Sequence, residues 1–475
     1  MRETPACFGV VVNRSASERG SALLGLAAWI RRQGWLRRIY QHFPQSLRNR
    51  VSLVLAAPAR KRVRFPRTPA WDWAPSKPVT RPTNLRSSSG LAFDGSAGVN
   101  IFAYFRGQFG LGESARLYTR ALIDAGYPVA LFDIGLQLPH GFDDGSLDDY
   151  LSSETPYDIH LLFVNPDYLE DSLHEIGRAK LARGYVIACW FWELEIIPPE
   201  WLPALDIVDE IMVSSSFVEA AFRRVTDKPI LRIPLPLGDE PDSGLSRTDF
   251  GLRSNAFIFL VTFDFNSWLD RKNPFAAIEA FMRAFPLERD DVQLLVKSSN
   301  GYRHPEPFLR LLNAASNDSR IVVRDEVIGR HHIQAMQRCA DAYVSLHRAE
   351  GFGLGLAESM RLGKPVVATA WSGNVDFMDE RNSLLVDYEL VPVETGQYSH
   401  SQGQRWAEAN IEQAATCMRR LVDEPGLAER IGNQARKDIH EKLSARAIAD
   451  CLIGRLRLIH GDRITIEPPT SFLDM

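Results

Sequence analysis

The sequence predicts an α/β protein with two parallel-sheet domains. Three observations predict this class. The chain is 475 residues long, short apolar runs alternate with helical patterns in two series, and a polar stretch at 238–253 separates the series. A chain of this length exceeds one ordinary hydrophobic core, so two domains are the natural expectation. Strands that alternate with helices are typical of parallel sheets with helical crossovers.

The first series follows a stretch at residues 65–98 that is rich in Pro, Ser and Gly and is typical of a linker. A helix is expected from Glu113 to Ala125, between the first two strands. Five buried strands are expected at residues 99–105, 127–132, 159–164, 184–190 and 210–214.

The second series repeats this plan after the polar stretch, which is the expected hinge. Its strands are expected at residues 256–262, 292–296, 320–323, 342–346 and 366–369. A helical tail is expected over about 411–460. We therefore predict an N-terminal extension and linker at 1–97, a first domain at 98–245, a second at 246–430, and returning C-terminal helices at 431–475.

Composition excludes several classes of protein. Hydrophobic residues make up 45% of the chain, charged residues 24%, and the net charge is −4, which disfavours general nucleic-acid binding. The five cysteines are scattered without a CxxC pair, so reduced thiols are expected rather than disulfides or a zinc site. No apolar run has the length of a transmembrane helix, and no secretory signal is evident at the N-terminus. We expect a cytoplasmic protein.

Charge is distributed unevenly along the chain. Between Glu18 and Asp72 there are twelve basic residues and no acidic one, interleaved with side chains such as Trp29, Trp35 and Ile39. This mixture over 19–71 favours an amphipathic segment on an anionic membrane surface, and hence peripheral attachment to the inner face of the plasma membrane. A basic tail without a membrane role, or a helix packed on the body of the protein, are the alternatives.

The segment around Glu350 carries the strongest functional pattern. An apolar strand precedes it, the glycine-rich turn 351–353 follows at once, and Glu358 lies in the next helix. Such a strand–turn–helix junction binds anions, because free N–H groups meet the positive end of the helix dipole there. Carboxylates on both sides can accept hydrogen bonds from sugar hydroxyls. The pattern therefore indicates a phosphorylated, polyhydroxylated ligand.

This pattern resembles the donor-site signature of family 4 glycosyltransferases, retaining enzymes with the GT-B fold. Glu350 and Glu358 form its Glu-x7-Glu pair, with Gly-Phe-Gly after the first acid and Gly363-Lys-Pro-Val366 after the helix. The resemblance implies two Rossmann-like domains that face a central cleft. It also implies transfer of a hexose from a nucleoside-diphosphate sugar, without a metal or other cofactor. An ordinary strand–helix crossover with solvated glutamates is the alternative.

The resemblance also implies roles for individual residues. Glu358 would bind the ribose hydroxyls of the nucleotide. Glu350 would bind sugar hydroxyls and help to stabilise positive charge at the anomeric carbon. Gly351, Phe352 and Gly353 would present backbone N–H groups to the phosphates.

Two cations follow the first strand of the second domain. Arg271 and Lys272 precede a helix for which Asn273 is the expected N-cap and Pro274 the first residue. Fixed cations at this place would stabilise the charge of a departing diphosphate. Lys272 resembles the diphosphate-binding lysine of family 4, and Arg271 is the candidate to replace an arginine that the family carries several residues earlier. A solvated basic pair is the alternative, and Lys297 is a weaker candidate for the same anion.

The first domain offers a glycine loop with two interpretations. Gly107, Gly110 and Gly112 precede the expected helix. They resemble the N-terminal glycine loop of family 4, which makes Gly110 and Gly112 candidates for donor binding. Asp133 ends the next strand about 20 residues later, as in a dinucleotide site. An NAD-dependent oxidoreductase therefore stays open as an alternative, as does a non-catalytic sugar-nucleotide-binding protein of the same fold.

The acceptor side is less defined. Trp192 and Glu193 follow a strand of the first domain and are candidates to stack on a sugar and to orient its hydroxyl. A core position for Trp192 is an equal alternative. His347 is expected to be a packed histidine at a strand end. The acidic run at 143–149 is expected to be solvated surface, and no cluster of His and Cys suggests a metal. With a basic N-terminal segment, the expected acceptor is a glycan or a lipid-linked intermediate of bacterial surface polysaccharide synthesis.

Overall fold

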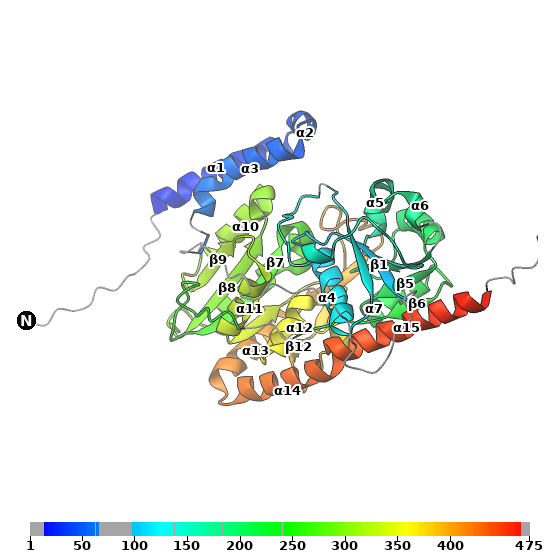
Figure 1. Ribbon diagram of the computed structural model, residues 1–475. Coiled ribbons are helices and arrows are strands. Elements are labelled where there is room, and N and C mark those ends of the chain that lie inside the picture. Colours follow the sequence, from blue (N-terminus) through cyan, green and yellow to red (C-terminus); the bar gives the residue numbers. More distant parts are fainter. Residues whose placement is uncertain are drawn as a thin grey trace, which may run out of the picture.

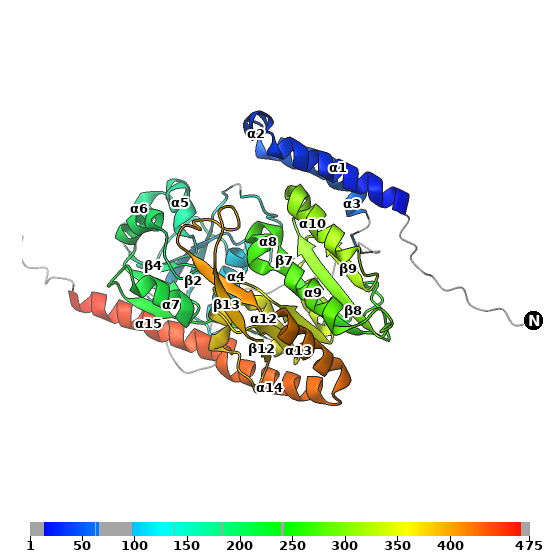
Figure 2. The same ribbon diagram turned by 180° about the vertical axis from the view of Figure 1, so that it is seen from behind.

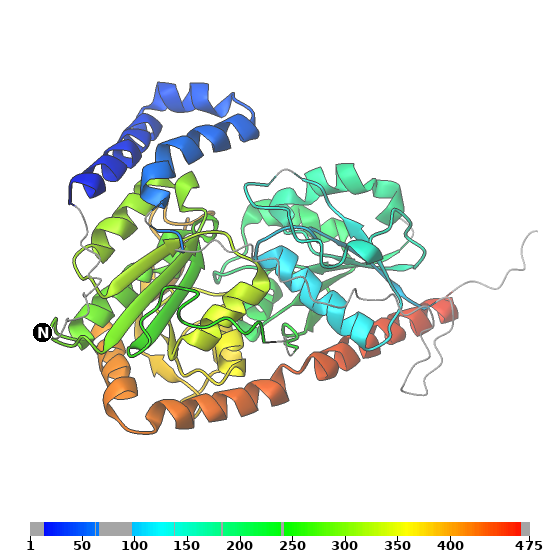
Figure 3. The same ribbon diagram turned by 60° about the vertical axis from the view of Figure 1, so that its left-hand side comes forward.

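The computed structural model describes residues 14–61, 63–65, 97–136, 138–181, 184–238 and 242–466. Two α/β domains stand side by side, with three N-terminal helices above the second domain and the C-terminal helices beneath both (Figures 1 and 3). Residues 66–96 of the expected linker and 239–241 of the expected hinge lie outside the described residues.

The first domain is organised around a parallel six-stranded sheet. The strand order is β2-β1-β3-β4-β5-β6. The strands are β1 (Val99–Ala103), β2 (Val129–Asp133), β3 (Ile159–Leu162), β4 (Tyr185–Cys189), β5 (Glu210–Val213) and β6 (Ile230–Arg232). The sequence predicts the first five because they are buried apolar runs. It misses β6, a three-residue edge strand whose side chains are half-buried or exposed.

The second domain repeats the arrangement. Its six-stranded sheet has the order β12-β11-β10-β7-β8-β9. The strands are β7 (Phe257–Asp264), β8 (Val292–Ser299), β9 (Ile321–Asp325), β10 (Ala342–Ser345), β11 (Val366–Thr369) and β12 (Leu384–Val386). The antiparallel pair β13 (Tyr388–Pro392) and β14 (Arg405–Ala409) stands apart from both sheets. No apolar run in the sequence predicts β12, β13 or β14.

Helices cover the sheets and connect their strands. In the first domain they are α4 (Gly110–Asp124), α5 (Leu169–Ile176), α6 (Arg178–Leu181) and α7 (Ser216–Arg223). In the second they are α8 (Leu269–Lys272), α9 (Pro274–Ala284), α10 (Pro305–Ala315), α11 (Arg330–Cys339), α12 (Leu354–Arg361), α13 (Ile411–Asp423) and α14 (Leu427–Lys442). Helix α4 begins three residues before the predicted start, and its first turn includes Gly110 and Gly112.

The last helix joins the two domains. Helix α15 (Ala445–Ile466) runs beneath the first domain and packs against α4 (Figure 3). Leu452, Leu456 and Ile459 are buried in the same core cluster as strand β1. Arg455 donates to Glu210 at the start of β5 over 2.7 Å. The C-terminal helix is therefore anchored on the first domain by apolar packing and an ion pair.

The N-terminal helices pack on the second domain. They are α1 (Arg14–Arg32), α2 (Gly34–Gln41) and α3 (Gln45–Arg60). Helix α1 lies along α3 and α10, and α3 contacts the short 3-10 turn η5 (Gly301–Arg303). Leu24 and Ala56 are buried in the core of the second domain. The face of helices α1 and α3 that carries Leu24 and Ala56 is thus packed on the body of the protein.

No helix in the described ranges is both long enough and apolar enough to cross a bilayer.

Candidate active site

A cleft of about 300 Å³ lies between the two domains. Both sheets contribute to it at their carboxyl ends, where ligands bind in open parallel sheets. The first domain lines it with residues such as Gly110, His140 and Glu193, and the second with Arg271, Lys272, Glu350 and the start of α12. Charged groups thus concentrate on the second domain's wall.

The turn after Glu350 is shaped by contact between the domains. A side chain on Gly351 would place its Cβ 2.9 Å from the backbone oxygen of Trp192 in the first domain. Ser215 of the first domain donates to the Gly351 oxygen over 2.6 Å. Gly353 adopts φ +94° as the N-cap of α12, a conformation that glycine tolerates. Glycine is therefore required at both places.

The start of α12 faces the cleft. Gly351, Phe352 and Gly353 line the cleft together with Leu354 and Gly355 of the first helical turn. N–H groups in a first turn have no partner within the helix, and the helix dipole is positive there. This wall can therefore bind a phosphate, as the sequence predicts.

Glu350 is the centre of a buried ion network. Its carboxylate pairs with Lys272, and its second oxygen lies 3.4 Å from Nη1 of Arg271. Burial alone would raise the pKa of Glu350, but the two cations lower it to about 2. Burial lowers the pKa of Lys272 in turn, against the opposing effect of Glu350. Glu350 is therefore a carboxylate at neutral pH.

Arg271 links the two domains. Its guanidinium donates to the Ala349 oxygen over 2.8 Å, and Nη2 lies 3.5 Å from Glu193 of the first domain. The side chain is 5% exposed, whereas that of Lys272 is 21% exposed. Lys272 is consequently the more accessible cation in the cleft, and Arg271 holds the carboxylates of both walls in place.

The local structure around Asn273 explains how Arg271 and Lys272 are placed. The short helix α8 ends at Lys272, and Asn273 follows in a left-handed conformation. The Asn273 side chain accepts a hydrogen bond from the Ala276 N–H, and Pro274 is the first residue of α9. The predicted cap is confirmed. It turns the chain so that both cations reach the ends of the strands.

The family match falls on this half of the site. Residues 268–393 match the family model described as Glycosyl transferases group 1. This segment is a group 1 glycosyl transferase domain. The matched residues include Lys272, Glu350 and Glu358 and end at Val393, directly after strand β13. The predicted resemblance is confirmed at this level, and assignment to family 4 stays a prediction.

Two curated relatives have matching segments. The chain is 23% identical over 217 residues to a trehalose synthase of Rubrobacter xylanophilus, covering 44% of this chain and 46% of that protein. It is 25% identical over 182 residues to a trehalose synthase of Pyrococcus horikoshii, covering 37% and 38%. The match thus spans less than half of the length of either relative.

Solved structures share the arrangement of the two domains. A glycosyltransferase from Rickettsia africae has a TM-score of 0.56 at 16% identity and covers 79% of this chain and 100% of its own. Sucrose-phosphate synthase from Thermosynechococcus elongatus has a TM-score of 0.55 at 16% identity, covering 77% and 100%. HepE from Anabaena, solved with UDP and glucose, has a TM-score of 0.52 at 15% identity, covering 76% and 100%. The predicted GT-B fold is confirmed.

The second glutamate of the group 1 domain lies deeper than the first. Glu358 is 3% exposed and is ion-paired with Arg330, and Gln337 Nε2 lies 3.3 Å from its other oxygen. Arg330 also lies 3.1 Å from Glu113 in helix α4 of the first domain. Glu358 thus belongs to a second ion bridge between the domains, beside the cleft rather than among the residues that line it.

Besides Glu358, three predicted site residues do not line the cleft. Lys297 is buried away from it and donates to Ser299 over 2.7 Å. Gly112 is needed for packing, because a Cβ there would lie 2.6 Å from the Gly107 oxygen. Trp192 is 2% exposed, and its indole N–H donates to the Ile196 oxygen. Burial removes these groups from direct binding, whereas the predicted Gly110 and Glu193 do line the cleft.

A hairpin of the second domain reaches the first domain's wall. It consists of β13, β14 and the loop 393–404, and β13 lies between the helices of the two domains (Figure 2). The Tyr398 hydroxyl donates to Glu193 over 2.6 Å. Gln404 exchanges hydrogen bonds with the backbone of Ile196 in both directions. We call residues 388–409 the arm.

No sequence pattern singles out Tyr398 or His140. His140 lines the cleft, stacks on Phe109 with ring centroids 4.4 Å apart, and lies 3.3 Å from Asn266 of the second domain. Burial lowers the pKa of His140 to about 4. Both residues lie in irregular loops, where no periodicity marks a functional side chain.

His347 and the acidic run at 143–149 lie outside the cleft lining. His347 is fully buried and hydrogen-bonds Ser345 and Asn374, as expected of a packed histidine. Within the acidic run, Asp144 lies 3.3 Å from Arg116, and Asp148 accepts from Arg106. The described part of the chain has no group of three or more His, Cys, Asp or Glu side chains that could hold a metal ion.

Proposed function

We propose that the protein is a retaining glycosyltransferase of family 4 that moves a hexose from a nucleoside-diphosphate sugar to a glycan or lipid-linked acceptor. The observation that carries the proposal is the pairing of Lys272 and Arg271 with Glu350 beside the start of α12, inside a group 1 domain. Cations, a helix N-terminus and an ionised carboxylate are what a departing diphosphate and a sugar ring require.

The nucleotide would bind along the second domain's wall. The first turn of α12 would receive the phosphates, and Lys272 would neutralise the charge that develops on the leaving diphosphate. Glu358 would bind the ribose once the ligand enters, in competition with its present partner Arg330. Resident cations supply the charge that a metal ion would otherwise bring, so no cofactor is part of the proposal.

The reaction would proceed on one face of the sugar. The bond between the anomeric carbon and the diphosphate oxygen breaks, and an acceptor oxygen forms the new bond from the same side. The acceptor's proton passes to the departing phosphate oxygen, which leaves a glycoside and a nucleoside diphosphate. Glu350, a carboxylate with a pKa of about 2, would stabilise positive charge at the anomeric carbon.

The acceptor would enter along the first domain's wall. Glu193 lines that wall and could orient an acceptor hydroxyl. The basic N-terminal segment suggests a peripheral membrane enzyme of the cytoplasmic face that acts in bacterial surface polysaccharide synthesis.

Donor binding is the decisive test. The 475-residue chain would be heated with UDP-, GDP- and dTDP-sugars, with UDP-glucose first because HepE has been solved with it. One nucleotide series should raise Tm, and the Lys272→Ala variant should lose that shift. NAD is the control for the oxidoreductase alternative. Protection by NAD without protection by any nucleotide sugar would overturn the proposal.

Turnover separates an enzyme from a binding protein. The donor that raises Tm should be hydrolysed slowly by the wild-type protein, and Glu350→Gln should abolish the release of nucleoside diphosphate. Binding of donor without hydrolysis, and without transfer to any glycan or lipid-linked acceptor, would favour the non-catalytic alternative.

A further inference from the structure

Exposed apolar side chains concentrate on the N-terminal helices. Eight of the seventeen large hydrophobic residues that are exposed in the described chain lie between Leu26 and Val54. These eight residues are Leu26, Trp29, Trp35, Ile39, Phe43, Leu47, Val51 and Val54. Apolar patches of this kind on a folded protein mark an interaction surface.

These side chains point away from the protein body. On α1, Leu24 and Ala27 are buried, whereas Leu26 and Trp29 are exposed. At 3.6 residues per turn, the two pairs lie on opposite faces of the helix. On α3 the buried Ser52, Ala56 and Ala59 and the exposed Leu47, Val51 and Val54 divide in the same way. One face of each helix therefore packs on the second domain while the other remains available.

The charged side chains of residues 19–61 are all basic. Arg38, Arg50 and Lys61 are exposed, and residues 19–71 contain no acidic side chain. Arg32, by contrast, is ion-paired with Glu306 of α10 and so helps to fix α1 on the second domain. A surface of aromatic, aliphatic and basic side chains complements an anionic lipid leaflet.

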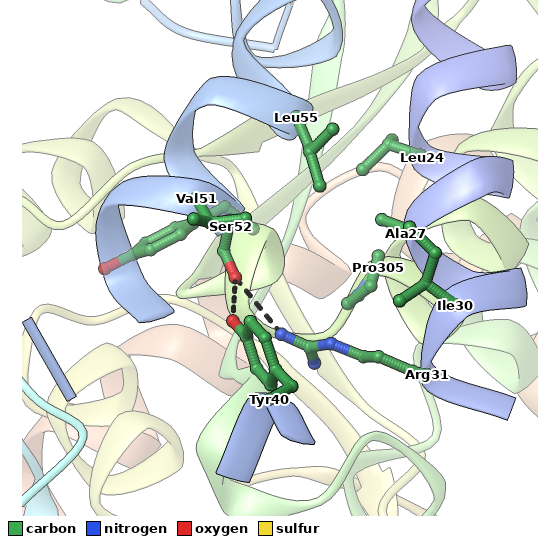
Figure 4. Close-up of a pocket in the computed structure, with 10 residues that line it drawn as sticks. Leu24, Ala27, Ile30, Arg31, Tyr40, Val51, Ser52, Leu55 and Pro305 are labelled. Carbon is green, nitrogen blue, oxygen red and sulfur yellow. Dashed lines mark hydrogen bonds between the residues drawn. The ribbon is translucent and has the colours of Figure 1, made fainter. Parts of the chain in front are cut away.

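A second apolar feature lies within the same helices. A pocket of about 70 Å³ opens between α1, α2, α3 and the start of α10 (Figure 4). Leu24, Ala27 and Ile30 line one side, and Val51 and Leu55 line the other. Val51 is 41% exposed, so the pocket reaches the surface that carries the apolar side chains.

The polar groups of the pocket are few and are bonded to one another. Ser52 lies 3.0 Å from the Tyr40 hydroxyl and accepts from Arg31 over 3.2 Å (Figure 4). Arg31 also donates to the Arg303 oxygen. The remaining wall is hydrocarbon, which suits an apolar chain better than a headgroup or a sugar.

We propose that this pocket takes the end of one acyl chain of an anionic phospholipid when the N-terminal helices dock on a membrane. The inference rests on the membrane contact included in the proposed function and adds its binding site. The exposed apolar stripes enter the interface, Arg38 and Arg50 contact lipid phosphates, and one chain inserts between α1 and α3. The second domain is thereby held at a fixed orientation to the bilayer.

The test uses monomeric lysophosphatidylglycerol, below its micelle concentration, and the full-length protein. Calorimetry should show binding that strengthens with chain length and then levels off once the pocket is filled. Glycerophosphoglycerol, which has no chain, should not bind. Affinity that is absent, or that rises without limit along the chain series, would overturn the pocket assignment.

Two variants separate the pocket from the surface. Ala27→Phe fills the pocket and should weaken lysolipid binding at least tenfold, while Val54→Ser, outside the pocket, should leave it unchanged. Both should reduce sedimentation with phosphatidylglycerol vesicles, and neither protein should sediment with phosphatidylcholine vesicles. Equal lysolipid binding by Ala27→Phe and wild type would overturn the proposal. Retained Tm and circular dichroism would show that Ala27→Phe is folded.

Failure of this inference is distinguishable from failure of the proposed function. Protection from unfolding by the nucleotide-sugar donor depends on the cleft and should be the same in Ala27→Phe and wild type. If no nucleotide sugar protects the protein but lysolipid binds as described, the lipid site stands and the glycosyltransferase proposal falls.

Discussion

The two walls of the cleft are built in different ways. The second domain's wall places Lys272 and Glu350 at the ends of neighbouring strands, and one continuous family match covers them. The first domain's wall combines His140 and Glu193 from separate loops, and the arm brings Tyr398 from the other domain to hydrogen-bond Glu193. The contrast teaches that the second domain's wall is built within one continuous segment, residues 268–393, whereas the first domain's wall depends on segments far apart in the sequence.

Two lysines of the second domain, one in the cleft and one outside it, give the strongest test of that wall. Lys272→Ala should lower the rate of sugar transfer about 100-fold or more, because one preformed charge at the leaving group is lost. Lys297→Met is the matched control, since Lys297 does not line the cleft. It should change the rate by no more than about threefold. Release of nucleoside diphosphate measures both rates. Equal losses in the two variants would show that Lys272 has no specific role in the cleft.

The Arg330 ion bridge between the two domains should contribute to stability. Arg330→Ala leaves Glu113 and Glu358 without their shared partner. Removing one member of a buried ion pair costs about 3 kcal/mol. The free energy of unfolding in urea should fall by that order, with weaker donor binding. Arg338→Ala, from the same helix, is the control, and an equal loss there would argue against a specific bridge.

Acid should weaken the two walls over different pH ranges. Burial lowers the pKa of His140 to about 4 in the folded protein against 6.5, so protonation favours the unfolded chain and the free energy of unfolding falls as pH drops from 6.5 towards 4. Glu350 titrates at about 2 against 4.5, so its contribution is lost only below pH 4.5. The loss of stability that His140 causes by pH 4 is roughly 3 kcal/mol.

Urea unfolding at pH 7, 5.5 and 4.5 would measure this difference. His140→Gln should flatten the fall in stability between pH 6.5 and 4. His332→Gln is a useful comparison, because burial also lowers the pKa of His332 to about 4, away from the cleft lining. An unchanged pH profile in His140→Gln would contradict the assignment of His140 to that range.

The arm should have the smallest effect. Tyr398→Phe removes the hydrogen bond to Glu193 but keeps the ring contacts with Trp192 and Trp268. The loss of one such bond is worth about 1 kcal/mol, so the acceptor KM should rise about fivefold. Donor hydrolysis in the absence of acceptor should stay the same. A donor defect of equal size would show that the arm serves both walls.

Most of the fold follows from local patterns. Ten of the twelve sheet strands are buried apolar runs, and the Asn273 cap is a local signal. Strands β6 and β12 have three residues each, too few to show a period. Strand β13 carries only half-buried and exposed side chains, so no continuous apolar run predicts the β13–β14 pair.

The sequence by itself determined the α/β class, the donor motif and the cations beside it. Each depends on residues close along the chain, whose spacing is fixed by strand and helix geometry. Tertiary structure alone decided that Glu358 pairs with Arg330, that Trp192 is buried, and that Tyr398 reaches Glu193. The two pairs join residues 28 and 205 positions apart in the chain, and packing of whole domains, rather than local pattern, brings them together and buries Trp192.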